Sequence, residues 1–154
     1  MSYTIEEFDI VKTKVLKYVI YKKRTENEVY MKFKNQIDED ILEDVIEELK
    51  ENGYISDEKY IERAVNEFMA LKNLSIKEIK YKLCSKGISR KVLDEYVLNN
   101  IDELEEYEQK SAENIALKKS VNMDEIEIKQ YLLKKGYKEE NIIQAIAGVQ
   151  EWRK

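Results

Sequence analysis

The sequence predicts an all-α protein: a tandem repeat of three three-helix modules that form an elongated, curved array. Three observations support this prediction. The 154 residues include no proline and only four glycines, a composition that favours helix throughout. Apolar residues recur at three- and four-residue spacings. Helix-start motifs return about every 50 residues, a spacing typical of repeat architectures. We therefore expect an N-terminal extension over 1–10 and modules over 11–55, 56–101 and 102–154.

The first module opens with a helix that has an apolar side. Thr25 and Glu28 then form a capping box, in which each side chain satisfies a backbone N–H of the other residue. This box starts a second helix with Val29 and Phe33 inward. A third helix is expected over 41–52. The inward residues of the first and third helices are Val11, Val15, Leu16, Val19, Ile20, Ile41, Leu42, Val45, Ile46 and Leu49.

A short junction links the first module to the second. Gly53 can take the left-handed conformation that ends a helix, and Tyr54 and Ile55 are expected to plug the turn. Either Ser56 or Asp57 can cap the next helix, over 57–72. The first module lacks a glycine at its own internal turn, where Asn35 is available for the left-handed position.

The same order of signals returns twice. Ser75 with Glu78, and Asp124 with Glu127, repeat the capping box. Glycine-plus-apolar turns follow both boxes, and Ser89 is expected to cap the helix after the first of them. The predicted structural junctions are Gly53, Tyr54, Ile55, Gly87, Ile88, Gly136 and Tyr137. The inward residues of the last helices include Val92, Leu93, Ile142, Ile143, Ile146 and Val149. An irregular helical bundle with good helix starts is the alternative.

The composition excludes several classes of function. The chain contains no histidine, so it has no His-based triad and no His-ligated zinc. It also lacks phosphate-cradling glycine loops, and its many carboxylates are typical of solvated helix faces. We predict a protein that is not an enzyme, with no catalytic residue, metal or cofactor. A single cysteine, an acidic N-terminus and the absence of a long apolar run predict a cytoplasmic protein without a membrane segment.

Charge is segregated along the chain although the formal net charge is only −5. The balance is +6 over 12–34 (eight bases, two acids), −9 over 38–67 (three, twelve) and +6 over 72–91 (seven, one). The balance is −7 over 94–113 (one base, eight acids) and +2 over 118–154 (eight bases, six acids). Such bands can steer a polyanion or an acidic protein. They can equally neutralise one another or keep the chain in solution.

Aromatic and thiol side chains allow two interpretations. Tyr21, Tyr30 and Tyr81 lie beside basic residues and are candidates for stacking on bases, although helix-edge tyrosines often only pack. Trp152 follows the register of Val149 and is interpreted as a packing anchor. Cys84 is expected to be a partly buried thiol without catalytic partners.

Three stretches resemble the RecX family of regulatory proteins. They are Leu49-x-x-x-Gly-Tyr-Ile-x-Asp-Glu-x-Tyr60, Tyr21-x-x-Arg-Thr-x-x-Glu-Val29 and Lys82-Leu-x-x-Lys-Gly-Ile88. The resemblance covers residues 11–149 and implies tandem three-helix modules. It also implies a non-enzymatic modulator of the RecA recombinase that binds in the groove of the RecA–single-stranded DNA filament. Members typically inhibit the ATPase, strand-exchange and coprotease activities of RecA, and so regulate repair, recombination and the SOS response.

The resemblance and the charge bands together suggest contact residues. We expect a monomer that contacts the RecA filament, and single-stranded DNA within it, through Lys77, Lys80, Lys82, Lys86, Arg90 and Lys91, with a second patch of Lys22, Lys23 and Arg24. Two alternatives remain: a helix-turn-helix type of nucleic-acid-binding module, and a helical scaffold for an unrelated protein partner.

Overall fold

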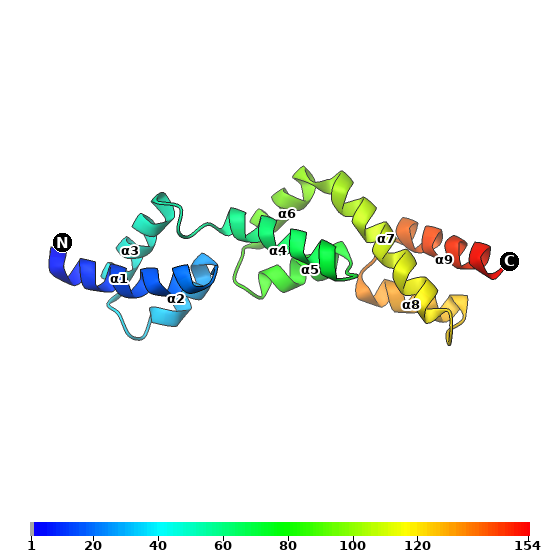
Figure 1. The fold of residues 1–154 in the computed structure, drawn as a ribbon, viewed down its shortest axis with the longest axis horizontal. Coiled ribbons are helices and arrows are strands. Elements are labelled where there is room, and N and C mark those ends of the chain that lie inside the picture. The colour runs from blue at the N-terminus through cyan, green and yellow to red at the C-terminus, as the bar shows by residue number, and fades with distance from the viewer. Residues whose placement is uncertain (1) are drawn as a thin grey trace. The chain divides into compact units, whose positions relative to one another are not determined.

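The computed structural model describes residues 2–154, and these residues form nine α-helices and no strand. The chain is therefore all-α, as the sequence predicted (Figure 1). The helices are α1 (Ile5–Tyr21), α2 (Glu26–Phe33), α3 (Glu39–Glu51), α4 (Asp57–Leu71), α5 (Ile76–Cys84), α6 (Arg90–Asn99), α7 (Ile101–Lys119), α8 (Glu125–Lys135) and α9 (Glu139–Arg153).

All three predicted capping boxes are present, at the starts of α2, α5 and α8. The Thr25 hydroxyl accepts from the Glu28 amide at 3.0 Å, and the Glu28 carboxylate accepts from the Thr25 amide at 3.1 Å. Ser75 and Glu78 make the same pair of bonds, as do Asp124 and Glu127. Each box satisfies two backbone donors that the first turn of a helix leaves free. The second helix of every triple thus begins where the sequence predicts.

The first core lies among α1, α2 and α3. α1 begins at Ile5 with Thr4 as its cap, so residues 5–10 of the predicted extension are its first turns; Met1 lies outside the described residues. Ile20 was expected to face inward but is 64% exposed. The buried residues of this core are Val15, Val19, Val29, Phe33, Ile41, Leu42, Val45, Ile46, Leu49 and Ile55.

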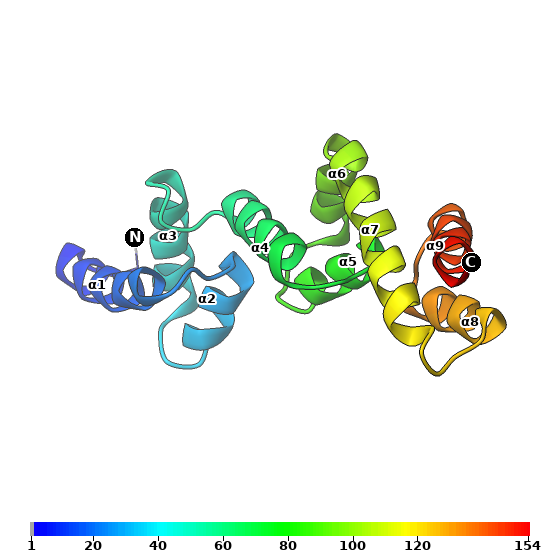
Figure 2. The ribbon, with the colours of Figure 1, turned by 45° about the vertical axis from the view of Figure 1, so that its right-hand side comes forward.

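The last core lies among α7, α8 and α9. Figure 2 shows α8 and α9 beside the C-terminal half of α7. Two predictions for α9 were wrong, because Ile143 is 58% exposed and Trp152 is 69% exposed. The buried residues are Ala112, Ala116, Ile128, Leu132, Tyr137, Ile142, Ala145 and Val149.

Between these cores, α5 packs against both α6 and α7. Val92 of α6 was expected to face inward but is 40% exposed, while the next residue, Leu93, is buried. Ser89 caps α6 as predicted, since its hydroxyl accepts from the Val92 amide at 3.3 Å. Other buried residues of this region include Leu74, Ile76, Ile79, Leu83 and Leu104.

The chain divides into two compact units. One comprises the residues up to Arg63 together with Ser85–Ile88, and the other comprises Ala64–Cys84 and Ser89–Lys154. The division passes through α4. The module boundaries at 55/56 and 101/102 stay a prediction, as does the shape of the array as a whole.

Three glycines end helices in the left-handed conformation, with φ of 81° at Gly53, 88° at Gly87 and 93° at Gly136. Buried plugs follow each of them: Ile55, Ile88 and Tyr137. Tyr54 was also expected to be a plug, but its side chain is 47% exposed. Asn35 does not adopt the left-handed conformation, since no residue other than glycine has positive φ in the described part of the chain.

Neither a membrane segment nor a metal site is found in the described residues. No helix among residues 2–154 combines the length and apolar character of a membrane span. No group of three His, Cys, Asp or Glu side chains in this range is placed to hold a metal ion.

Candidate functional site

A basic groove lies on the outer side of α5. Its volume is about 500 Å³, and its lining residues are Lys77, Lys80, Tyr81, Cys84 and Arg90. The helix produces this arrangement directly, because Ile76, Ile79 and Leu83 are buried at three- and four-residue spacings and the residues between them face outward. Arg90 joins them as the first residue of α6.

Half of the contact residues predicted for this region line the groove: Lys77, Lys80 and Arg90. Lys80 is also paired with Asp94 of α6 at 2.5 Å, which partly neutralises it. Lys82, Lys86 and Lys91 are exposed but lie outside the lining. The groove therefore combines three cations with the ring of Tyr81, which is 77% exposed.

Cys84 differs from its prediction as a partly buried thiol, because it is exposed at the groove. It is the last residue of α5, one position beyond the buried Leu83. Neighbouring lysines on the same helix were visible in the sequence, but the exposure of the thiol depends on the absence of a covering element.

The second predicted patch is divided by the structure. Lys22 and Lys23 are exposed and line a separate groove of about 440 Å³. Arg24 points elsewhere: its guanidinium carbon lies 4.2 Å from the centre of the Tyr18 ring, a cation–π contact. The Nε of Arg24 is buried, and no hydrogen-bond partner for it is present in the described structure.

The starts of α2 and α5 make the same contact to a later turn. The hydroxyl of Thr25 donates to the Lys86 carbonyl at 2.7 Å, and the hydroxyl of Ser75 donates to the Lys135 carbonyl at 2.7 Å. In both cases the acceptor precedes the left-handed glycine, Gly87 or Gly136. The two capping residues are fully buried. The capping residues of these two boxes thus also bond a turn about 60 residues further along the chain.

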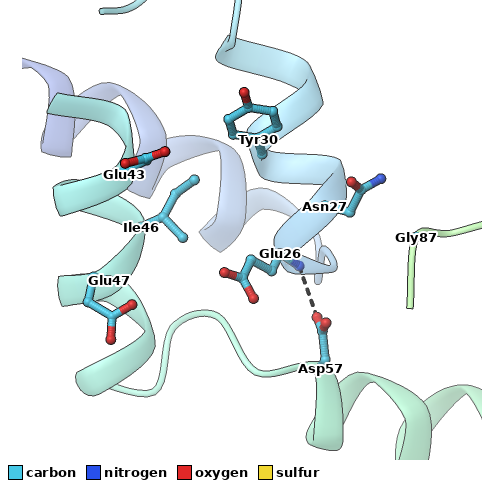
Figure 3. A pocket seen from close by; sticks show the side chains of 8 residues that line it. All are labelled: Glu26, Asn27, Tyr30, Glu43, Ile46, Glu47, Asp57 and Gly87. Atoms are coloured by element: carbon cyan, nitrogen blue, oxygen red, sulfur yellow. Dashed lines mark hydrogen bonds between the residues drawn. The ribbon is translucent and has the colours of Figure 1, made fainter. Parts of the chain in front are cut away.

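A carboxylate from a later helix also accepts a hydrogen bond from the first turn of α2 and of α5. Asp57 accepts from the amide of Glu26, the first residue of α2, at 2.9 Å (Figure 3). Glu108 accepts from the amide of Ile76, the first residue of α5, at 2.9 Å. Helix N-termini favour negative charge, so both carboxylates are well placed. Of the two candidate caps for α4, Ser56 is the one that bonds the helix, through the Lys59 amide.

Glu108 is the more deeply buried of the two carboxylates, with no exposed surface. Besides Ile76, it accepts from the Lys138 amide at 3.4 Å and from the side-chain amide of Asn141. It therefore lies between the N-termini of α5 and α9. Glu108 could not be predicted from the sequence, because nothing in the acidic run 94–113 distinguishes it from its solvated neighbours.

Two tyrosines near Glu108 form further hydrogen bonds between α7 and other segments. The Tyr107 hydroxyl donates to the Lys72 carbonyl at 2.6 Å and accepts from the Leu74 amide at 2.9 Å. Tyr137 and Ser111 share a buried hydroxyl–hydroxyl bond of 2.7 Å. Burial raises the pKa of both Tyr107 and Tyr137 above the usual value for tyrosine.

A pocket of about 550 Å³ lies beside the start of α2 and is lined by several carboxylates. Glu43 and Glu47 of α3 face Glu26 of α2, which lies beside Asp57, and Gly87 lies beyond α2 (Figure 3). Lys50 pairs with Glu26 at 3.3 Å and with Glu47 at 3.7 Å, and these carboxylates raise the pKa of its ammonium group. The charge of this pocket is therefore opposite to that of the two basic grooves.

Comparison with known proteins shows what class of protein this fold defines. No family model matches the chain. Two crystal structures share the all-α fold: RecX from Lactobacillus salivarius (TM-score 0.83, 24% identity, covering 96% of this chain and 99% of that one), and another described as regulatory protein RecX (TM-score 0.77, 22% identity, 90% and 72%). The chain thus has the all-α fold of these two structures.

Sequence relatives are more specific. Regulatory protein RecX of Clostridium beijerinckii is 32% identical over 154 residues, covering 94% of this chain and 70% of the relative. That of Staphylococcus epidermidis is also 32% identical, covering 90% and 54%. The chain belongs to the RecX family. It spans only 36% and 43% of the length of two other relatives, from Streptococcus uberis and Finegoldia magna.

Proposed function

We propose that this protein is a non-enzymatic regulator that binds the RecA recombinase filament and inhibits its ATPase, strand-exchange and coprotease activities. The observation that carries the proposal is the similarity to the Clostridium beijerinckii regulatory protein RecX over 94% of the chain. Such a protein regulates DNA repair and recombination without catalysing a reaction of its own.

The basic groove on α5 is the surface that best fits this role. A nucleoprotein filament offers phosphates and acidic protein surface, and both are complementary to a cluster of cations. Lys77 and Arg90 have no ion-pair partner within the described residues, so their charge is available to a ligand. Lys82, Lys86 and Lys91 are also exposed and are further candidates for contact, and Lys22 and Lys23 supply a second surface.

The direct test is DNA-dependent ATP hydrolysis by the cognate RecA on single-stranded DNA, with this protein titrated in. We expect hydrolysis to fall as the protein approaches stoichiometry with RecA. An unchanged rate at near-stoichiometric ratios contradicts the proposal. A rise in rate contradicts the direction of the effect while leaving filament binding in place.

Paired charge variants test the surface. Lys77→Gln with Arg90→Gln is expected to raise the concentration needed for half-inhibition at least fivefold. Lys118→Gln with Lys129→Gln removes the same charge from exposed positions in α7 and α8 and serves as the control. Equal effects from both pairs indicate that net charge, rather than the groove, decides affinity.

A gel-shift assay with duplex DNA separates this function from a helix-turn-helix module. Such a module binds duplex alone, with affinity that falls steeply as salt rises. We expect no duplex shift by the protein alone at low salt, because its formal net charge is −5.

A further inference from the structure

A second groove brings together residues from three segments that are distant in the sequence. It is lined by the C-terminal end of α1, by the turn between α3 and α4, and by Arg63 of α4, and its volume is about 440 Å³. All of these residues belong to the first compact unit. The lining residues are Val19, Ile20, Tyr21, Lys22, Lys23, Gly53, Tyr54 and Arg63.

Two exposed aromatic rings line this groove. Tyr21 is 86% exposed and Tyr54 is 47% exposed, although Tyr54 was expected to plug the turn. The turn that carries Tyr54 is closely tied to α3: the Tyr54 amide bonds the Leu49 carbonyl at 2.9 Å, and the Gly53 amide bonds the Lys50 carbonyl at 3.0 Å. The ring is therefore presented from a fixed backbone, which lowers the entropic cost of stacking against it.

The space beside Gly53, the residue before Tyr54, is open. A Cβ built on Gly53 has no neighbouring atom within 4 Å. Gly53 needs its left-handed φ of 81°, but close packing does not account for the absence of a side chain. Apart from its chain neighbours, no residue thus covers the turn at Gly53, so a ligand can approach the turn there.

The charged lining of the groove is entirely positive. Lys22, Lys23 and Arg63 line it and no carboxylate does. Within residues 2–154, these three cations make no ion pair or hydrogen bond. Arg63 lies in the acidic run 38–67, so the charge pattern of the chain did not predict a basic site there. A local cluster of this kind attracts a polyanion even when the whole chain is acidic.

We propose that this groove binds a short stretch of single-stranded nucleic acid, with a base stacked on Tyr54 and phosphates beside Lys22, Lys23 and Arg63. Single strands are bound by cationic grooves with aromatic platforms, because every base has a face that can stack. A duplex keeps its bases stacked and cannot use the rings. An acidic peptide matches the cations but gains little from two open tyrosines. The site acts on the strand itself and does not depend on RecA.

The first experiment measures fluorescence anisotropy of a labelled oligothymidine of about twelve nucleotides, within the usual site size for such proteins, at low salt and without RecA. Tyr54→Ala is expected to raise the Kd at least fivefold, whereas Tyr54→Phe keeps it within twofold because stacking does not need the hydroxyl. Trp152→Ala, which removes an exposed aromatic from α9, is the matched control. Circular dichroism verifies that each variant is folded.

The second experiment tests the charges. Lys22→Gln, Lys23→Gln and Arg63→Gln together are expected to reduce the slope of log K against log salt by about two, since each phosphate contact on a single strand contributes about 0.7. Lys118→Gln, Lys129→Gln and Lys134→Gln remove equal charge from exposed positions in α7 and α8 as the control.

Four outcomes overturn the proposal. They are no binding of the strand by the full chain at low salt, equal affinity for an abasic strand of the same length, equal losses from Tyr54→Ala and Trp152→Ala, and equal slopes for the two charge triples. Binding of polyglutamate in place of the strand identifies the site as one for acidic peptides. None of these outcomes depends on the effect of the protein on RecA, so the two proposals fail separately.

Discussion

Glu108 shows how much a single carboxylate does when two helices begin beside it. Its oxygens accept from the amides of Ile76 and Lys138 and from the side chain of Asn141, all in a fully buried position. A glutamine keeps one acceptor oxygen but directs an NH₂ group at donors. We predict that Glu108→Gln lowers the free energy of unfolding by about 2 kcal/mol, typical for a lost hydrogen bond to a charged group.

Urea unfolding followed by circular dichroism measures this loss. Glu106→Gln changes an exposed neighbour in the same helix and is expected to remain within about 0.5 kcal/mol of the parent. Similar values for the two variants are incompatible with a special role for the buried carboxylate.

Tyr137 makes the stability of the last core sensitive to alkali. Burial raises its pKa, so the unfolded chain loses the tyrosine proton at a lower pH than the folded chain does. The contribution of the buried, neutral Tyr137 to the free energy of unfolding is therefore complete below the unfolded pKa of about 10, and it is lost as the pH rises above that value. We predict that Tyr137→Phe reduces the fall in Tm between about pH 8 and pH 11.

The variant also carries a cost that does not depend on pH. It loses the buried bond to Ser111, about 1 kcal/mol at neutral pH. Tyr81→Phe, at an exposed position on α5, is the control. Parallel Tm profiles for parent and Tyr137→Phe exclude this tyrosine as a source of alkaline instability.

Residues with local partners could be predicted from the sequence, and those with distant partners could not. Thr25 and Glu28 are three positions apart, so their capping box is visible in the chain. Glu108 bonds groups about 30 residues away on both sides, which no local pattern encodes. Trp152 follows the helical period of Val149, but periodicity identifies a face without showing whether another element covers it.

At the scale of the element, the three capping boxes are alike in sequence but differ in surroundings. Ser75 is fully buried and its hydroxyl also bonds the Lys135 carbonyl, whereas Asp124 is exposed and makes only its own box. Loss of a cap costs about 1 kcal/mol. We predict that Ser75→Ala costs about 1 kcal/mol more than Asp124→Ala, because it also loses the hydrogen bond to the Lys135 carbonyl.

Thermal and urea unfolding of the two variants in parallel give this difference. Thr25→Ala, whose hydroxyl bonds the Lys86 carbonyl, is expected to behave like Ser75→Ala. Equal costs at Ser75 and Asp124 contradict a joining role for the buried hydroxyl.

The glycine turns are also equivalent in backbone conformation but not in packing. A Cβ on Gly87 comes within 2.3 Å of the Asn27 side chain, whereas a Cβ on Gly53 meets nothing within 4 Å. Gly53→Ala is expected to cost about 1 kcal/mol, the strain of a left-handed alanine. Gly87→Ala is expected to cost at least about 2 kcal/mol, because the close approach adds to that strain.

A double-mutant cycle tests the contact. Adding Asn27→Gly to Gly87→Ala removes the atoms that the new Cβ meets, and we expect it to recover part of the loss. Strict additivity of the two substitutions is inconsistent with a contact between Asn27 and this turn.

The sequence predicted these helices more fully than the surfaces they present. Capping boxes and apolar spacing are properties of single elements, so all nine helices and the starts of α2, α5 and α8 were predictable. Arg24 was grouped with Lys22 and Lys23 by position, but its guanidinium stacks on Tyr18 of α1. The groove with Tyr54 and Arg63 needs three segments to meet, so only the folded chain reveals it.

At the scale of the whole molecule, the start of α5 depends on residues of α7 and on the end of α8. The first core draws only on residues 3–55 and includes no residue of the last helices. α5 begins with Leu74, Ser75 and Ile76 bonded to Tyr107, Lys135 and Glu108. In arrays of repeats, stability is carried largely by such neighbour contacts.

We therefore predict that removing the third predicted module, residues 102–154, weakens α5 much more than α3. Amide hydrogen exchange of the shortened chain is expected to show protection lost in α5 and α6 but kept in α1–α3, because only α5 loses bonded partners at its first turn. Glu108→Gln in the full chain is the matched control and should lower protection at the same end of α5 to a smaller degree. Undiminished protection of α5 in the shortened chain would show that the second helix triple is stable without these contacts.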